Sequence, residues 1–249
     1  MVKWKVKAIQ VGTINSNMSG VLHYIGESRP VVLPIWIVAA TDGKNKVLID
    51  TGIDDLASVV AGPEPNCRQE KEEETLTALK NMMGWEPEEV NFIINTHLHF
   101  DHCGCNKYFK NARICVQKKE WESAHHPISS TAFLYYRPFF DKNAVPYFQW
   151  QFVEGETELM PGLAVIPTPG HTEGHQSVLI NTEEGVLCVA GDIVTIADNI
   201  NRNIEANIVV DAAKVYESFV RIRDRARLIL PGHEFSVKNG AESGFPLID

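Results

Sequence analysis

The chain has 249 residues, 44% of them hydrophobic, and a formal net charge of −9. This length and an even composition predict a single domain over residues 1–249. No apolar run approaches the ~18 residues needed to span a bilayer, so we expect no membrane partner. The negative charge argues against nucleic acid, whose binding needs cations that neutralise phosphates. Five cysteines form an odd set without the density of a secreted scaffold, which favours a reducing, cytoplasmic location.

Runs of β-branched and apolar residues, separated by turn residues, indicate a chain rich in strands. The strands are expected over residues 5–11, 31–40, 46–50, 90–95, 113–117, 163–166, 177–181, 186–190 and 227–230. Asp42-Gly43 separates the second run from the third and predicts a hairpin. At the N-terminus, in Met1-Val2-Lys3-Trp4-Lys5-Val6-Lys7, basic residues alternate with apolar ones, which indicates an edge strand rather than a signal peptide.

Helical patterns are fewer along the chain. One helix is predicted over residues 69–83 with Gly84 as its stop, and a short one over 118–124. A third follows Asp211, whose side chain can cap it. The stretch 191–210 between the last strands and this helix is expected to be a loop.

Residues 125–152 show no clear periodicity but carry many aromatic side chains. We interpret this segment as an aromatic-rich insertion into the scaffold. Two readings stay open for it. The aromatic side chains form a satellite core under a long loop, or they form a lid or pocket wall against an apolar part of a substrate.

Side chains of the types that bind metals follow the predicted strands. They are Asp50, His97, His171, Asp192 and His233. Strand ends on a rigid sheet are suitable places for a functional site, because the sheet fixes the residues that follow each strand.

The densest group is His97-x-His99-x-Asp101-His102, with four such side chains in six residues. Imidazole together with carboxylate suits Zn²⁺, Mn²⁺ or Fe²⁺. In a regular strand His102 would point away from the other three, whereas in a loop all four can converge on a space wide enough for two ions. The motif therefore predicts a ligand loop. A histidine-rich surface loop is the alternative, and the glycine-rich turn at His171 makes it less favoured.

Taken in order, these segments resemble the metallo-β-lactamase superfamily. The segments that carry the resemblance are Leu48-Ile49-Asp50-Thr51-Gly52, His97 to His102, Thr168-Pro169-Gly170-His171, Ala190-Gly191-Asp192 and Pro231-Gly232-His233. The stretch His99-Phe100-Asp101-His102-Cys103-Gly104 followed by Asn106-Lys107-Tyr108-Phe109 is most similar to the N-acyl homoserine lactonases and the pyridoxolactonase-like enzymes. The resemblance implies an α/β layered fold, an αββα sandwich with two facing sheets, helices outside and metals at one edge.

The resemblance also implies roles for individual residues. One metal would be held by His97, His99 and His171, and the second by Asp101, His102 and His233. Asp192 would bridge two divalent ions, zinc foremost with Mn²⁺ or Fe²⁺ as alternatives, and the ions would share a hydroxide that attacks a carbonyl. Asp101 would also carry a proton to the leaving oxygen. Asp50 would orient a ligand from behind.

The implied activity is hydrolysis of a small lactone, with N-acyl homoserine lactone as one candidate and quorum quenching as the resulting role. The alternatives are hydrolysis of a cyclic amide, an imide or a thioester, and a non-catalytic metal-binding module. Such lactonases often carry a tyrosine where this chain has Thr195. Tyr135 or Tyr136 can supply the missing hydroxyl, and Met18 lies in the segment that would form an opposing pocket wall. The expected partner is a small molecule, and the expected state is a monomer or homodimer.

Overall fold

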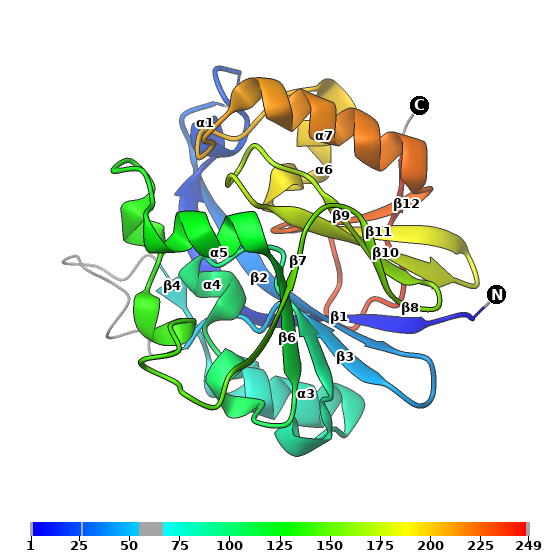
Figure 1. Ribbon diagram of the computed structural model, residues 1–249. Coiled ribbons are helices and arrows are strands. Elements are labelled where there is room, and N and C mark those ends of the chain that lie inside the picture. The colour runs from blue at the N-terminus through cyan, green and yellow to red at the C-terminus, as the bar shows by residue number, and fades with distance from the viewer. Residues whose placement is uncertain (1, 26, 55–66, 248–249) are drawn as a thin grey trace.

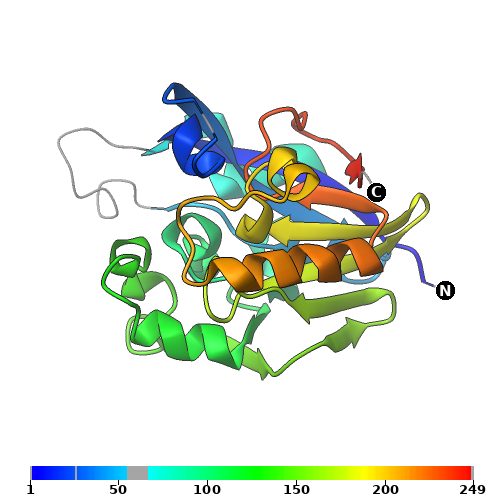
Figure 2. The same ribbon diagram turned by 90° about the horizontal axis from the view of Figure 1, so that it is seen from above.

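The structure is a computed structural model that describes residues 2–25, 27–54 and 67–247. Two sheets face each other, and helices cover their outer faces (Figure 1). The helix α7 (Ala212–Arg225) lies over one sheet, and α3 (Thr75–Met83) lies under the other (Figure 1). Seen from above, α7 runs lengthwise along the strands that it covers (Figure 2). The predicted αββα sandwich is therefore confirmed.

Within the described residues, the first sheet has seven strands in the order β4-β1-β2-β3-β5-β6-β7. Their bounds are β1 (Lys5–Asn17), β2 (Pro30–Thr41), β3 (Lys46–Ile49), β4 (Cys67–Arg68), β5 (Phe92–Ile94), β6 (Arg113–Gln117) and β7 (Gln149–Val153). The strands β1, β2 and β3 are antiparallel, and β3, β5, β6 and β7 are parallel. Asp42 accepts hydrogen bonds from the amides of Lys44 and Asn45, which closes the predicted hairpin between β2 and β3.

The second sheet has six strands in the order β13-β12-β11-β10-β9-β8. Their bounds are β8 (Thr157–Met160), β9 (Leu163–Pro167), β10 (Gln176–Thr182), β11 (Gly185–Gly191), β12 (Leu228–Pro231) and β13 (Phe245–Pro246). The pairs are antiparallel except β11 with β12, which are parallel. A parallel pair needs a crossover connection, and α7 provides it.

The shorter helices lie at the ends and edges of the sheets. They are α1 (Met18–Val21), α4 (Phe100–Cys103), α5 (Lys118–His125) and α6 (Ala197–Arg202). Single 3-10 turns occur at Lys71–Glu73, Pro87–Glu89, Asn106–Tyr108, Ala132–Leu134, Arg137–Phe139 and Asp192–Val194. Asp211 caps α7 by accepting from the amide of Lys214 at 3.1 Å, as its residue type predicted. Among the described residues, no helix is long and apolar enough to cross a membrane.

The three largest hydrophobic clusters of the described residues match this architecture. Between the sheets, Trp36 and Val38 of the first sheet and Trp4, which precedes β1, pack with Val165 and Val178 of the second. A second cluster joins α3 to the outer face of the first sheet, and a third joins α7 to the outer face of the second. The two sheets are thus held as a rigid frame, and the loops at their strand ends are positioned by it.

Several predicted boundaries were wrong. The helix expected over 69–83 begins at Thr75, because the extended backbone of Glu74 separates it from the preceding 3-10 turn. The loop expected over 191–210 contains α6. The aromatic segment ends in β7, which pairs with β6, so its last residues belong to the scaffold. In β7 polar and aromatic residues alternate, and the density of aromatic residues concealed that period.

The edge position expected for the first strand is modified by the C-terminal segment. Among the described residues β4 pairs with Thr13 and Ile14 of β1, beyond the predicted run. On that run, the amide of Ala8 donates to the carbonyl of Ala241, and the amide of Gly240 donates to the carbonyl of Ala8. This side of β1 is therefore covered in part by a returning chain.

Candidate metal centre

All seven predicted ligands follow strands, and the structure brings them to one place. His97 and His99 lie in the loop after β5, His171 lies between β9 and β10, Asp192 follows β11 and His233 follows β12. The seven side chains are buried or nearly so, the most exposed being Asp192 at 11%. Strands from both sheets therefore present their ends to the same edge of the sandwich.

The ligand motif is a loop at its start and a helix at its end. His97 and His99 lie in a loop as predicted, but Asp101 and His102 belong to the single helical turn α4. The amides of His102 and Cys103 donate to the carbonyl of His99, at 3.1 and 3.2 Å, and so form this turn. Within this turn His102 lies beside the preceding ligands, with its ring centroid 4.1 Å from that of His97.

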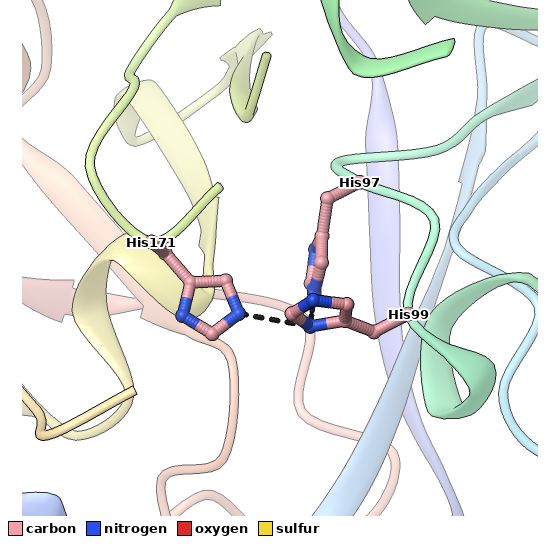
Figure 3. Close-up of side chains that lie close together, drawn as sticks. All are labelled: His97, His99 and His171. Carbon is pink, nitrogen blue, oxygen red and sulfur yellow. Dashed lines mark hydrogen bonds between the residues drawn. The ribbon is translucent and has the colours of Figure 1, made fainter. Parts of the chain in front are cut away.

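Three histidines form the first group (Figure 3). The Nε2 atom of His97 lies 2.9 Å from Nδ1 of His99, and Nε2 of His171 lies 3.1 Å from that same Nδ1. Their ligand atoms all lie within 4.8 Å of one another. Three ring nitrogens thus point at a common space from two separate loops.

A second group lies next to the first and contains both carboxylates. The Nε2 atom of His102 lies 3.5 Å from an oxygen of Asp101, and Nε2 of His233 lies 3.6 Å from the same oxygen. Asp192 stands between the groups: its oxygens lie 3.2 Å from His102, 3.2 Å from His233 and 3.6 Å from His171. Its position is that of a carboxylate shared by both groups.

Outer hydrogen bonds decide which ring nitrogen faces inward. Nδ1 of His171 lies 2.8 Å from the carbonyl of Ile208, and Nδ1 of His233 lies 2.7 Å from that of Pro34. A carbonyl accepts, so each Nδ1 carries the proton and each Nε2 keeps a lone pair. Such outer acceptors are the usual partners of metal-binding histidines.

Buried polar atoms without a hydrogen-bond partner indicate that this arrangement can bind cations. Among the described residues, Nε2 of His102 and Oδ1 of Asp192 are buried at the centre and make no hydrogen bond. Buried polar atoms are normally paired, so each such atom requires an explanation. Lone pairs of neutral imidazoles and carboxylate oxygens are the donors that zinc and similar divalent ions take. The residues therefore fit a pair of divalent metal ions.

Asp50 supports the second group by a hydrogen bond to the outer nitrogen, Nδ1, of His102. Its backbone has φ 58°, a left-handed conformation that is uncommon for a residue other than glycine. Its carboxylate accepts from the amide and the hydroxyl of Thr96, both at 2.8 Å, and from Nδ1 of His102 at 2.8 Å. The last bond orients the ring of His102 so that Nε2 points into the centre.

The charges of the centre follow from burial and from its two carboxylates. Burial lowers the pKa of His97 and of His99 well below the ordinary value. Burial acts on His102 in the same direction, but Asp192, Asp101 and Asp50 outweigh it and raise the pKa of His102. Burial acts to raise the pKa of Asp192, yet His233 and His102 hold it well below its usual range. Asp192 is thus a carboxylate and not an acid.

The predicted substrate residues lie in different surroundings. Thr195 is buried just after Asp192, and its carbonyl accepts from the amide of His233. The ring of Tyr135 stands edge-on to His99 with centroids 4.7 Å apart, and its hydroxyl lies 3.3 Å from Glu120. Tyr136 packs edge-on against Phe139. Met18 lines a cavity of about 570 Å³ beside α6, together with Ile196 and Phe235.

Other polar residues lie around the centre. Nδ1 of His175 lies 2.9 Å from the hydroxyl of Thr168. Gly191 has φ 62°, and a Cβ there would lie 2.7 Å from Nε2 of His175. Glu120 and Thr172 were missed, because their proximity to the centre depends on contacts between distant segments.

Known proteins with a similar sequence or fold include several lactonases. An N-acyl homoserine lactonase of a Bacillus species is 34% identical over 159 residues, which are 61% of this chain and 60% of that protein. The N-acyl homoserine lactonase of Bacillus cereus is 30% identical over 191 residues, 74% of this chain and 72% of that protein. A solved structure of an N-acyl homoserine lactone hydrolase, with the product N-hexanoyl-L-homoserine at its catalytic metal centre, has 28% identity and a TM-score of 0.80, with 94% of each chain covered.

The sequence pattern of the metallo-β-lactamase superfamily matches residues 30–233. That range contains the strands of both sheets except β1 and β13. It also contains all seven of the converging side chains. The resemblance inferred from the ligand motifs is thereby confirmed. The chain belongs to the metallo-β-lactamase superfamily.

Proposed function

We propose that this protein is a dinuclear metal-dependent hydrolase that opens a small lactone, with N-acyl homoserine lactones as the leading substrate class. The observation that carries the proposal is the convergence of seven buried side chains of metal-binding type. Two of them, His171 and His233, donate from Nδ1 to backbone carbonyls, so that Nε2 faces inward. Similar proteins named as lactonases support the choice of a cyclic ester. Hydrolysis of such a signal would be quorum quenching, and we propose a cytoplasmic monomer or homodimer.

The proposed ligand assignment follows the two groups. One ion would be held by His97, His99 and His171, and the other by Asp101, His102 and His233, with Asp192 shared. We propose zinc, although the same donors accept Mn²⁺ or Fe²⁺. When bound, the ions supply Lewis acidity for the lactone carbonyl and make water a nucleophile at neutral pH.

The chain's own groups manage the proton. In lactone hydrolysis water adds to the carbonyl carbon, the acyl–oxygen bond breaks, and the leaving oxygen takes a proton to give a hydroxy acid. Asp101 is buried at 5% exposure within reach of both histidines of its group, where it can receive a proton from water and pass it to the leaving oxygen. Asp50 keeps His102 oriented while this occurs.

The cavity beside α6 supports a place for the acyl part of the substrate. Met18, Leu22 and Ile196 give it apolar walls, and its volume of about 570 Å³ is that of a small-molecule pocket. It lies next to the centre along the chain, because Ile196 follows Thr195 and Glu234 follows His233. Ligands of mixed character, with a polar head and an apolar tail, match this arrangement.

A substrate panel tests the proposal. Metal-loaded protein is assayed with N-acyl homoserine lactones of several chain lengths, a simple γ-lactone, a cyclic imide and a thioester, with ring opening followed by mass spectrometry. We expect the acyl homoserine lactones to show the highest kcat/KM. Faster hydrolysis of the imide or thioester would contradict the lactonase assignment, and metal-loaded protein that is inactive on every member would contradict the hydrolase assignment.

The Tyr136→Ala variant probes the aromatic segment. If Tyr136 contributes to the pocket wall, loss of its ring should raise KM by up to about tenfold, which corresponds to ~1.4 kcal/mol of contact energy. Metal content should stay at the value of the parent protein, because Tyr136 packs on Phe139 and not on a ligand. Steady-state kinetics with metal analysis checks both. Unchanged KM and kcat would place Tyr136 away from the substrate.

A further inference from the structure

Glu120 is a carboxylate buried inside the protein near the metal centre. It is the third residue of α5, directly after β6, and its exposure is 0%. A glutamate is rarely buried completely unless its oxygens are satisfied. The partners of this side chain therefore indicate what it holds in place.

Four donors surround the carboxylate, and none of them carries a charge. The amide of Leu98 donates to Oε1 at 3.0 Å, and the hydroxyl of Tyr135 to the same oxygen at 3.3 Å. The hydroxyl of Thr172 donates to Oε2 at 2.5 Å, and the amide of Gly174 also donates. Burial raises the pKa of Glu120, and these four hydrogen bonds oppose the rise.

Three of these donors, all except Tyr135, belong to the two loops that carry the first group of histidines. Leu98 lies between His97 and His99, and Thr172 follows His171. The carboxylate thus joins segments that lie 22 residues before and 52 residues after it in sequence. A second route leads through Tyr135, whose hydroxyl donates to Glu120 and whose ring stands edge-on to His99.

The backbone of α5 meets the second loop directly. A Cβ on Gly174 would lie 2.0 Å from the amide nitrogen of Glu120 and 2.4 Å from its Cα, so any larger residue would push the loop away. Glycine is needed here for close approach of two backbones. The loop that carries His171 is therefore fixed against the same helix end that supplies the carboxylate.

We propose that Glu120 is a positioning residue for the metal held by His97, His99 and His171: it sets the separation of their two loops and thereby the affinity of that metal position. This rests on the ligand assignment of the proposed function. Glu120 does not touch the ions or the substrate. Its role parallels that of Asp50, which orients His102 in the other group.

The test compares Glu120→Ala and Glu120→Gln with Glu122→Gln, a matched change of an exposed glutamate on the same helix. Apoproteins are titrated with Co²⁺ against a chelator, and the visible absorption of each metal equivalent is recorded. Loss of an outer partner of a metal ligand typically weakens binding 10–100-fold. We expect Glu120→Ala to weaken one equivalent by about that factor and to change its spectrum, while the second equivalent stays as in the parent.

The Co²⁺ affinity of Glu120→Gln should lie between that of Glu120→Ala and that of the parent protein. The amide of Glu120→Gln keeps one accepting oxygen but turns an NH₂ group toward a donor, so we expect a loss of about 3–10-fold. Glu122→Gln should match the parent protein. A purely structural role would lower the melting temperature of the apoprotein and leave the Co²⁺ affinity and spectrum of the folded protein unchanged, and that result would overturn the proposal.

Two further arms keep the test decisive. If Glu120→Ala does not fold, Glu120→Gln and Thr172→Val, which removes one donor, decide the question by the same titration. Parent-like affinity and spectrum in both would overturn the proposal. No substrate enters these measurements. If the parent protein binds two metals, the Glu120 variants weaken one of them, and no lactone is hydrolysed, the proposed function would be overturned and this inference would stand.

Discussion

Asp192→Ala should abolish hydrolysis, with kcat/KM lower by about 10³-fold or more. Asp192 lies within 3.2–3.6 Å of histidines from both groups, so its loss removes the carboxylate that the two metal positions share. Two-metal centres contribute several kcal/mol to catalysis, and each 1.36 kcal/mol corresponds to a factor of ten. Metal content should fall with activity, which elemental analysis of the purified variant measures together with the kinetics.

Thr195→Ala is the matched control for this change. Thr195 lies three residues after Asp192 and is buried, but its hydroxyl contacts only the backbone carbonyl of Asp192, at 3.5 Å, and its own carbonyl accepts from the amide of His233. It should therefore retain both metals. The variant His99→Ala should behave like Asp192→Ala, because Nδ1 of His99 is the meeting point of the first group. Full activity in His99→Ala or in Asp192→Ala would refute the ligand assignment.

Removal of the metals with a chelator should lower kcat/KM by a factor similar to that expected for Asp192→Ala. It should also lower the stability of the folded protein. Ions that bind the folded chain stabilise it by ~4 kcal/mol when free metal is about 1,000 times Kd. For a domain of this size that corresponds to a decrease of roughly 10 °C in Tm after removal. The physical reason is that buried atoms of His102 and Asp192, which make no hydrogen bond in the protein, lose their partner when the metals are removed.

Readdition of metal separates this effect from damage to the protein. Zn²⁺, Mn²⁺ or Fe²⁺ should each restore Tm, and the ion that also restores the highest kcat identifies the productive metal. Protein passed through the same dialysis without chelator is the control. An unchanged Tm and rate in chelated protein with less than 0.1 metal per chain, as a rough threshold, would show that the centre does not depend on metal.

Much of the site could be predicted from the sequence because its donors are local or follow strands. Four of the seven ligands occur between His97 and His102, and the other three follow predicted strands at His171, Asp192 and His233. The boundary errors arose where backbone geometry overrides pattern. Asp101 and His102 form a helical turn because two amides share the carbonyl of His99, and no periodicity announces a turn of four residues.

The supporting residues could not be predicted in the same way. Glu120 looks like any acidic residue in a short amphipathic helix until its partners at Leu98 and Thr172 are known. The expectation that Tyr135 supplies a substrate hydroxyl stays a prediction. Its hydroxyl already lies beside Glu120, and burial together with that carboxylate raises the pKa of Tyr135, so the group remains a proton donor.

The division of the donors between the two sheets has a consequence for assembly. His97, His99, Asp101 and His102 follow the first sheet, whereas His171, Asp192 and His233 follow strands of the second. Each proposed metal position takes ligands from loops of both sheets, so each ion would link the two sheets of the sandwich through coordination bonds. Neither half of the chain can offer a complete coordination sphere alone. Uptake of metal would then report that the two halves have docked, and not that either sheet has folded.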